Sequence, residues 1–327
     1  MPELPLNPYW KSLGARFAAE GTWNVPANFG DVKAEYLAAK DTALIDFSWR
    51  AKIKVTGGDR ILVLHRLLTN DIKSLGPGRA CPAAFLTAQG KVVAVMDVYV
   101  FADHVLLDAE AGLGKKIIDR LGALIITEDA ALAEAEDLAH LGLWGQNAEA
   151  RARASGLAFF RRDLPEGPAF DLFVPAAGAE AAAKRLVNAG ARPCGVDAYE
   201  MLRIEKGLLR YGRDITEDMT LPETGLDRIS ASETKGCYPG QEVVARTNTY
   251  HGHAKKIVRV EFEKSAGAAA GDKFFVEGKE AGWLTSVSVP PSAEKGRGLG
   301  YALKGYFDAP LDVRIGAAAA KGRIFPD

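Results

Sequence analysis

Residues 51–59 read Ala51-Lys52-Ile53-Lys54-Val55-Thr56-Gly57-Gly58-Asp59 and indicate the fold class of the chain. Apolar and polar residues alternate up to Thr56, which is typical of a strand with one buried face. Beyond the glycine pair the period changes to that of a helix, with Asp59 as the predicted N-cap. The residues expected on the buried face of this helix are Ile61, Leu62, Leu64, His65, Leu67 and Leu68. A strand that leads directly into a helix predicts a mixed α+β protein.

The same reading extends to the rest of the chain. Strands are predicted at residues 84–87, 91–101, 105–108 and 138–144, and helices at 112–124, 178–190 and 200–209. The acidic residues 128–137 are predicted to be a solvated connection. From residue 257 onwards, short strands are separated by glycines, as in a small β-barrel. We therefore expect a mixed α and β region over residues 1–250 and a barrel domain over 251–327.

Composition narrows the class of protein. The 327 residues carry a net charge of −1, whereas general nucleic-acid-binding and membrane-surface proteins usually have a basic excess. Apolar runs are far below the ~18 residues that a membrane span needs. The first eight residues contain prolines and lack the basic and apolar regions of a signal peptide. We expect a cytoplasmic protein that binds neither nucleic acid nor membrane directly.

The three cysteines, Cys81, Cys194 and Cys237, are widely spaced and odd in number. No CxxC pair is present, so the sequence predicts neither a disulfide framework nor a thiolate zinc site. His251-Gly252-His253 suggests metal ligands, but it has no recurring zinc spacing and is more typical of a loop. No bound metal is therefore expected, and a reducing compartment fits best.

One octapeptide, Lys235-Gly236-Cys237-Tyr238-Pro239-Gly240-Gln241-Glu242, is the main candidate for chemistry. Its cysteine precedes a Pro-Gly turn and a segment that suits the first turns of a helix. The nearby Lys235 and the positive end of that helix both favour thiolate over thiol. The alternative is a small buried hydrophobic cysteine, but the polar flanking residues fit a sealed core poorly.

Several fragments, taken in order, resemble the folate-binding superfamily of the glycine-cleavage T-protein. They are Ile53 to Asp59 with Leu68-Thr69-Asn70-Asp71-Ile72, Leu202-Arg203-Ile204-Glu205-Lys206-Gly207 with Tyr211-Gly212-Arg213-Asp214, and Gly282-Trp283-Leu284-Thr285-Ser286 with Gly300-Tyr301-Ala302. The resemblance spans nearly the whole chain. It implies a three-domain cloverleaf around a central channel for tetrahydrofolate, with a small C-terminal β-barrel.

The octapeptide resembles the signature of the YgfZ branch of this superfamily. T-proteins have a Lys-x-Phe-Ile-Gly-Lys-like segment at this place, without the cysteine. The resemblance implies a folate-binding accessory protein for iron-sulfur cluster assembly, with indirect effects on tRNA modification and transient contacts with iron-sulfur enzymes. It marks Cys237 and Lys235 as reactive residues, within a motif that includes Gly236, Tyr238, Gly240, Gln241 and Glu242.

The resemblance also implies folate contacts. Glu205 matches the glutamate that accepts hydrogen bonds from the pterin, and Tyr99 is a candidate for the ring site. Arg246 and Lys256 are candidates for the glutamyl carboxylates of the folate tail, although basic residues are often simply solvated. The expected cofactor is tetrahydrofolate or a one-carbon derivative of it.

The transferase chemistry is less complete. T-proteins carry a Gly-Gly-x-x-Asp-Asp-x-x-x-Tyr stretch, in which a carboxylate orients the folate amine and handles its proton. In this chain Ala94-Val95 replace the acidic pair. Asp97 lies two residues further along a predicted strand, about 7 Å from Val95, and would substitute only after a register shift.

Three readings follow from the sequence. The first is the iron-sulfur accessory protein, which need not be a competent aminomethyltransferase. The second is a working folate-dependent aminomethyltransferase, favoured by the Glu205 segment and opposed by Ala94-Val95. The third is an interaction module that has kept the fold and lost the ligand, because fold does not determine function.

Overall fold

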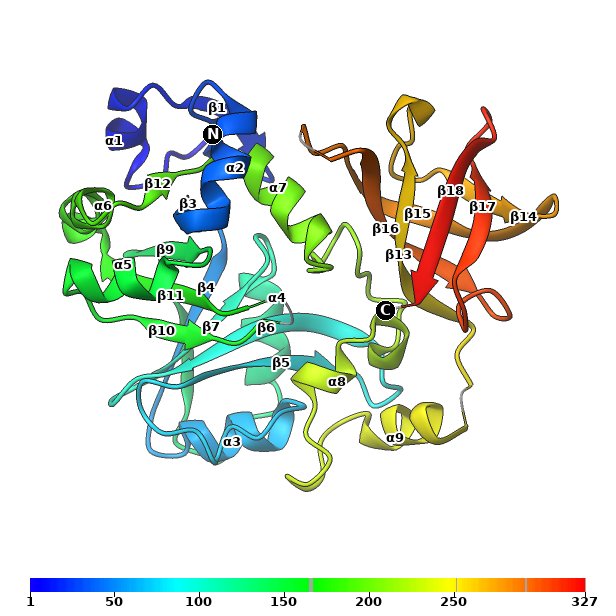
Figure 1. Cartoon of the computed structure of the whole chain (residues 1–327). Helices are drawn as coiled ribbons and strands as arrows, with labels where there is room; N and C mark the ends of the chain where they lie inside the picture. The colour runs from blue at the N-terminus through cyan, green and yellow to red at the C-terminus, as the bar shows by residue number, and fades with distance from the viewer. Residues whose placement is uncertain (165–166, 251, 292, 327) are drawn as a thin grey trace. The chain divides into compact units, whose positions relative to one another are not determined.

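The computed structural model describes residues 1–164, 167–250, 252–291 and 293–326 (Figure 1). The chain forms two compact units. Unit 1 comprises residues 1–83 and 95–199, and unit 2 comprises residues 84–94 and 200–327. The tip of one β-hairpin, residues 84–94, therefore belongs to the same unit as the C-terminal part of the chain.

Unit 1 is a mixed α and β structure. Its helices are α1 (Asn7–Ser12), α2 (Val32–Thr42), α3 (Arg60–Leu67), α4 (Gly114–Gly122), α5 (Ala148–Ser155) and α6 (Ala179–Asn188). A two-stranded sheet pairs β1 (Arg16–Glu20) with β2 (Trp23–Asn28). A five-stranded sheet has the order β10 (Phe160–Arg162), β11 (Ala169–Pro175), β9 (Leu138–Trp144), β3 (Ala43–Asp46) and β12 (Arg192–Pro193).

A second five-stranded sheet has the order β5 (Ala80–Leu86), β6 (Val92–Val100), β7 (Val105–Ala109), β4 (Ala51–Thr56) and β8 (Ala131–Glu134). These strands confirm the alternating patterns predicted at 51–56, 84–87, 91–101 and 105–108. The acidic stretch after residue 128 was wrongly predicted to be a plain connection, because residues 131–134 pair with β4 as an edge strand. Charged residues suit such an edge because they discourage further strand pairing.

The strand-to-helix junction that indicated the fold is present, but two of its details differ from the prediction. Gly57 has a φ of +101°, and a Cβ there would meet the carbonyl oxygen of Asp129 at 2.1 Å, so this turn requires glycine. Asp59 occupies the N-cap position of α3 without capping it; its carboxylate accepts a hydrogen bond from the backbone N–H of Asp129 instead. Leu62 is 55% exposed, and Val63 is buried in its place.

Unit 1 contains a cluster of buried ionisable groups. His140 on β9 lies between two buried carboxylates: its Nδ1 is 3.3 Å from Asp108 Oδ1 and its Nε2 is 3.0 Å from Asp171 Oδ1. A neutral imidazole has one N–H and could serve only one of them. Burial lowers the pKa of His140, but Asp108 and Asp171 outweigh this effect, and the pKa lies above its ordinary value. The two carboxylates therefore stabilise the imidazolium form relative to the neutral ring.

Two arginines complete this cluster. Arg50 Nε donates to Asp108 at 2.6 Å, and Arg162 donates through Nε to Asp171 at 2.9 Å and through Nη1 to Asp97 at 2.8 Å. Burial alone would raise the pKa of Asp171, yet that pKa lies well below its usual range because Arg162 and His140 stabilise the carboxylate. The buried acids are thus paired, which limits the cost of removing them from water.

The state of His140 predicts a pH-dependent stability. Because its folded pKa is raised, its stabilising effect is fully present below the ordinary histidine pKa of about 6.5 and is lost as pH rises through the folded pKa. We expect the difference in free energy of unfolding between the wild type and His140→Gln to shrink as pH rises from about 5.5 to about 9. Denaturant titrations at each pH measure this difference in free energy of unfolding. His104→Gln, which lies outside the cluster, is the control. A difference that is flat or grows with pH would contradict the protonated state.

Unit 2 is built around a closed six-stranded barrel (Figure 1). Its strands follow the order β13 (Lys255–Glu263), β16 (Lys295–Leu303), β15 (Lys279–Ser288), β14 (Lys273–Val276), β17 (Leu311–Ile315) and β18 (Ala320–Pro326). Before the barrel come the end of α7 (Val196–Glu205), α8 (Asp227–Ser230) and α9 (Gln241–Tyr250). The barrel and the mixed sheets confirm the α+β prediction. The helix predicted at 200–209 begins and ends four residues earlier.

A buried arginine joins α7 to the barrel within unit 2. Arg203 is fully buried and donates to Asp214 Oδ2 and to Ser286 Oγ on β15, each at 2.7 Å. Asp214, also fully buried, accepts hydrogen bonds from the hydroxyls of Thr285 and Ser286 at 2.6 Å each and from the backbone N–H of Arg210 at 3.0 Å. The segments around residues 203, 214 and 286 are therefore held together by one hydrogen-bonded charge pair.

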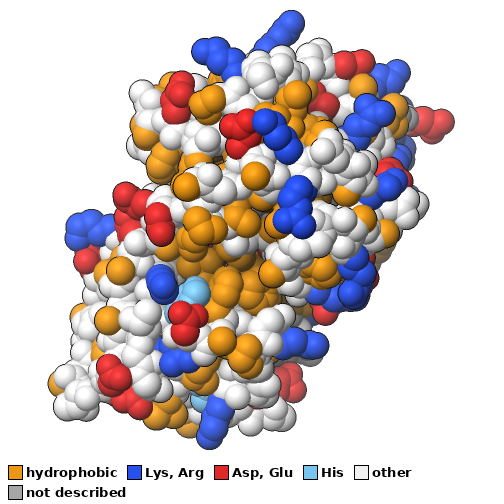
Figure 2. Space-filling view, turned by 90° about the vertical axis from the view of Figure 1, so that its left-hand side faces the viewer, with side chains coloured by type: hydrophobic (Ala, Val, Ile, Leu, Met, Phe, Trp, Pro, Cys, Tyr) orange, Lys and Arg blue, Asp and Glu red, His pale blue; other side chains and the backbone are white. Residues whose placement is uncertain are grey.

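The surface is mixed in charge. Acidic and basic side chains are interspersed over the face shown in Figure 2, in keeping with the net charge of −1. None of the helices in the described parts of the chain is long and apolar enough to cross a membrane.

Candidate functional site

The octapeptide forms the loop that leads into α9. Its Gly240 has a φ of +80°, and a Cβ there would meet the carbonyl oxygen of Thr87 at 2.6 Å. Residues 84–94 of the β5–β6 hairpin therefore lie directly against this loop within unit 2. The backbone N–H of Gln241 donates to the carbonyl of Tyr238 at 3.2 Å, which closes the turn before the helix. The predicted helix after Gly240 is confirmed as α9.

Cys237 differs from the other two cysteines in its exposure. It lies on the surface of the loop, whereas Cys194 is buried and Cys81 is half-buried. Burial, with smaller contributions from neighbouring carboxylates, raises the pKa of the Cys81 thiol to about 12. Burial likewise raises the pKa of Cys194 to about 12, and its thiol hydrogen-bonds to backbone carbonyls. Of the three thiols, Cys237 is the one that a solvent-borne reagent reaches directly.

Lys235 and Tyr238 contact each other. The Lys235 ammonium lies 5.2 Å from the centroid of the Tyr238 ring, a cation–π distance. Tyr238 is 8% exposed, and burial, followed by the carboxylates of Asp227 and Glu233, raises the pKa of its hydroxyl. The structure thus gives Lys235 a partner within its own motif, and its effect on Cys237 stays a prediction.

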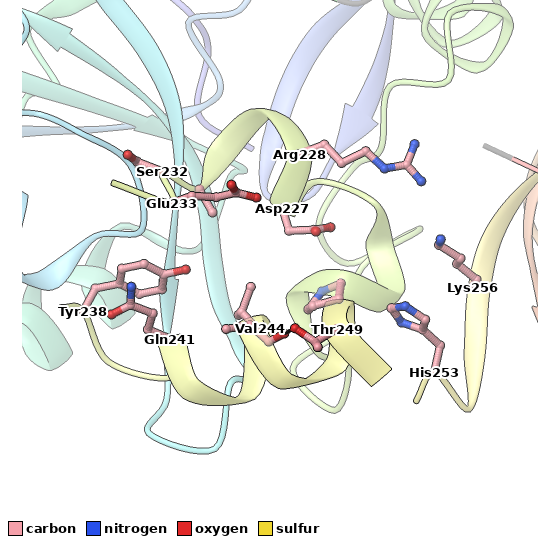
Figure 3. Close-up of a pocket in the computed structure, with 13 residues that line it drawn as sticks. Asp227, Arg228, Ser232, Glu233, Tyr238, Gln241, Val244, Thr249, His253 and Lys256 are labelled. Carbon is pink, nitrogen blue, oxygen red and sulfur yellow. Dashed lines mark hydrogen bonds between the residues drawn. The ribbon is translucent and has the colours of Figure 1, made fainter. Parts of the chain in front are cut away.

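A cavity of about 590 Å³ lies beside the octapeptide, within unit 2 (Figure 3). It is lined from four directions: by η2 (Leu221–Thr224) and α8, by the loop after α8, by one face of α9, and by the start of β13 with the segment before it. Its lining side chains are Pro222, Asp227, Arg228, Ala231, Ser232, Glu233, Tyr238, Gln241, Val244, Ala245, Thr249, His253 and Lys256. The cavity therefore brings together two motif residues, Tyr238 and Gln241, with the predicted folate contact Lys256.

The other predicted folate contacts lie elsewhere. Glu205 is the last residue of α7 and is half-buried, two positions beyond Arg203. Arg246 is exposed and lines a neighbouring hollow with Glu242, Ala245 and Thr249. The cavity beside the octapeptide includes neither Glu205 nor Arg246. Their shared role in binding one ligand stays a prediction.

Tyr99 is fully buried in unit 1. Its hydroxyl donates to Asp171 Oδ2 at 2.9 Å, and its ring packs edge-on against Phe160 and Phe173. Burial raises the pKa of this hydroxyl well above its ordinary value. A ring without exposed surface touches a ligand only if the packing around it opens, so the structure supports a structural role for Tyr99.

Asp97 is held in an ion pair with Arg162. Its side chain is 13% exposed and forms the ion pair with Arg162 described above. Burial raises the pKa of Asp97, and Arg162 opposes that rise. To act on a folate amine in place of the missing acidic pair, Asp97 would have to leave this arginine buried without one of its carboxylates. Val95 is half-buried and Ala94 is buried, so neither supplies a polar atom.

Sequence reasoning missed half of the cavity. It did not single out Asp227, Arg228 or Glu233, and it treated the histidines at 251 and 253 as a loop pair. His253 is buried and packs edge-on against Phe307, while residue 251 lies outside the described residues. In the described ranges, no cluster of His, Cys, Asp and Glu is arranged to hold a metal ion. The missed residues come from separate elements, and no spacing in the sequence links them.

Comparisons with known proteins agree on one relationship. The family model described as the GCVT N-terminal domain matches residues 6–155 and 167–233. A protein named aminomethyltransferase from Rubrobacter xylanophilus is 29% identical over 98% of this chain and 92% of its own length. A putative chloroplastic transferase from Arabidopsis thaliana is 28% identical over 80% of this chain and 65% of its own length.

Among solved structures, the glycine cleavage system aminomethyltransferase T from Bartonella henselae has the same fold. The TM-score is 0.90 at 21% sequence identity, and the match covers all of this chain and 97% of the other. The fold expected from the sequence, that of the T-protein with its C-terminal barrel, is confirmed.

The exposure of the three thiols predicts the order of their reaction with an alkylating reagent. Alkylation requires a thiolate that the reagent can reach. We expect Cys237 to be modified first in the folded protein and Cys81 and Cys194 only slowly, because burial raises the pKa of each to about 12. Mass spectrometry of peptides after timed iodoacetamide treatment measures the order, with denatured protein as the control. Equal rates for all three thiols in the folded protein would contradict it.

Proposed function

Because the chain belongs to the GCVT family, we propose that it binds reduced folate and acts as a folate-dependent transferase of the aminomethyltransferase type. The observation that carries this proposal is the extent of the match. Relatives named aminomethyltransferases align with 97–99% of this chain at 25–29% identity. A folate-linked role also fits the cytoplasm, which the cysteine pattern favours.

The surroundings of Glu205 support folate binding. Glu205 follows Arg203 on α7, and Arg203 is fixed by Asp214 and Ser286 in the core of unit 2. A carboxylate carried on such a rigid element can orient the amino-pyrimidine edge of a pterin through paired hydrogen bonds. Because the helix is already fixed, ordering Glu205 on binding costs little conformational entropy.

Glu205 therefore gives a direct test of folate binding. We expect tetrahydrofolate to bind saturably in isothermal titration calorimetry, and Glu205→Gln to weaken binding by one to two orders of magnitude. Loss of one charged hydrogen-bond partner typically costs about 1.5–3 kcal/mol, which corresponds to that factor.

Glu263→Gln is the matched control, because Glu263 is an exposed glutamate at the end of β13. If the wild type does not bind tetrahydrofolate at millimolar concentration, the proposed function is wrong. If Glu205→Gln binds as well as the wild type, the assignment of Glu205 to the pterin is wrong.

The aminomethyl transfer step needs a polar group that this chain lacks at the expected place. Aminomethyl transfer needs a group that orients the folate amine and handles its proton as the carbon arrives. Ala94 and Val95 cannot do so, and Asp97 is paired with Arg162. We propose that the folate framework is kept while the rate of aminomethyl transfer is low.

Restoring the carboxylate tests this explanation. We expect the wild type to release methylenetetrahydrofolate from an aminomethylated lipoyl carrier slowly, and Val95→Asp to release it faster. Val95 is half-buried, so a carboxylate there keeps contact with solvent. A spectrophotometric assay of methylenetetrahydrofolate gives both rates, with Val95→Asn as the isosteric control without charge. Fast turnover by the wild type would show that another group handles the proton of the folate amine. Loss of that turnover in Asp97→Asn would then identify Asp97 as this group.

A second function is favoured by one observation, the exposed thiol of Cys237 in the octapeptide. We propose it as an accessory role in iron-sulfur cluster assembly, in which an accessible thiol contacts a cluster or a sulfur species. In a strain lacking the gene, we expect the wild type, but not Cys237→Ser, to restore iron-sulfur enzyme activity. Because Cys237 is exposed, the serine variant should fold and melt like the wild type. A stable Cys237→Ser protein that restores full activity would end this proposal.

A further inference from the structure

The cavity beside the octapeptide carries opposite charges on its two sides. Glu233 lies on the side of Tyr238 and Gln241, while Lys256 and His253 lie on the opposite side (Figure 3). The carboxylate of Asp227 lies between these two sides in the same view (Figure 3). One side of the cavity is therefore acidic, and the other side is basic.

The cavity has the size of a small-molecule site. Its volume of about 590 Å³ falls within the range of about 300–1,000 Å³ that is common for ligand pockets. Pro222 and Val244 provide apolar wall, and Ser232 and Gln241 provide neutral polar groups. The side chains of Gln241 and Lys256, as distinct from their backbone groups, make no hydrogen bond or ion pair within the described ranges. Both side chains thus keep donors available for a ligand.

This distribution of charge selects the class of ligand. A simple anion would be attracted by Lys256 but would also face the carboxylate of Glu233. A simple cation would be attracted by Glu233 but repelled by Lys256. A ligand with an ammonium at one end and a carboxylate at the other satisfies both sides, because complementary potentials favour the match and like charges exclude the alternatives.

We propose that this cavity binds a small zwitterion of the α-amino-acid or short-peptide class. Its ammonium faces Glu233, with Tyr238 beside it, and its carboxylate faces Lys256 on the opposite side. The site is separate from the proposed folate contact at Glu205, which does not line the cavity. In this proposal Lys256 contacts the carboxylate of the zwitterion, and not the glutamyl carboxylates of the folate tail as the sequence suggested.

Calorimetric titration of the full-length protein without folate tests the proposal. The probes are glycine, L-glutamate and glycylglycine, each compared with its N-acetyl and its amide derivative. The first derivative removes the ammonium, and the second removes the α-carboxylate or terminal carboxylate. We expect at least one zwitterion to bind saturably and both of its derivatives to bind at least about tenfold more weakly, since each loses one charged contact. The preferred probe distinguishes a free amino acid from a peptide.

Variants place the binding in this cavity. Lys256→Met and Glu233→Gln should each weaken the preferred zwitterion by about tenfold or more. Lys321→Met and Glu263→Gln remove the same charges from exposed positions on barrel strands and should leave the affinity unchanged. Lys256→Met should also leave the affinity for tetrahydrofolate unchanged, so this test stands whether or not folate binds at Glu205.

Three results would overturn the proposal. The first is that none of the three zwitterions binds at millimolar concentration. The second is that the N-acetyl and amide derivatives bind as tightly as the parent compound, which would remove the need for two charges. The third is that Lys256→Met weakens tetrahydrofolate and leaves the zwitterion unaffected, which would return Lys256 to the folate tail.

Discussion

The buried pair of Arg203 and Asp214 is the constraint on which the structure of unit 2 depends. Neither side chain has exposed surface, so each charge has lost its hydration and must be neutralised by protein groups. The pair does this with Ser286 and Thr285 on β15, which ties two segments before the barrel to a strand of the barrel. These segments include residues 202–207 and 211–214, and Glu205 on the first of them gains a fixed position from the pair.

Unit 1 uses buried charge in a different way. Its cluster of Asp97, Asp108 and Asp171 is paired with Arg50, Arg162 and His140, and Tyr99 belongs to the same cluster. Two residues that the sequence suggested for folate chemistry, Asp97 and Tyr99, therefore stabilise this unit. The chemistry that remains accessible lies in unit 2, at the exposed Cys237 and in the cavity lined by Tyr238 and Lys256. The chain has the fold of the aminomethyltransferase T from Bartonella henselae, while Ala94 and Val95 supply no carboxylate.

The sequence predicted the elements of the fold well and the site only in part. Strands such as Ala51–Thr56 and Leu138–Trp144 were found because their side-chain pattern depends on local geometry alone. The edge strand at 131–134 was missed because acidic residues are typical of loops as well as of exposed edges. The roles of Tyr99 and Asp97 depend on Asp171 and Arg162, which are more than 60 residues away in the chain. The cavity joins residues from four parts of unit 2, and no local pattern encodes such a meeting.

The most direct test of this account is the free energy of unfolding of Asp214→Asn, compared with Asp312→Asn. Asp214→Asn leaves the buried guanidinium of Arg203 with Glu200 as a remaining carboxylate partner, and breaking a buried pair typically costs about 3–5 kcal/mol. Asp312 lies on β17 of the same barrel with an 85% exposed side chain, so its loss should cost about 1 kcal/mol or less. The account predicts a large loss of stability for Asp214→Asn alone. An Asp214→Asn protein as stable as the wild type would contradict it.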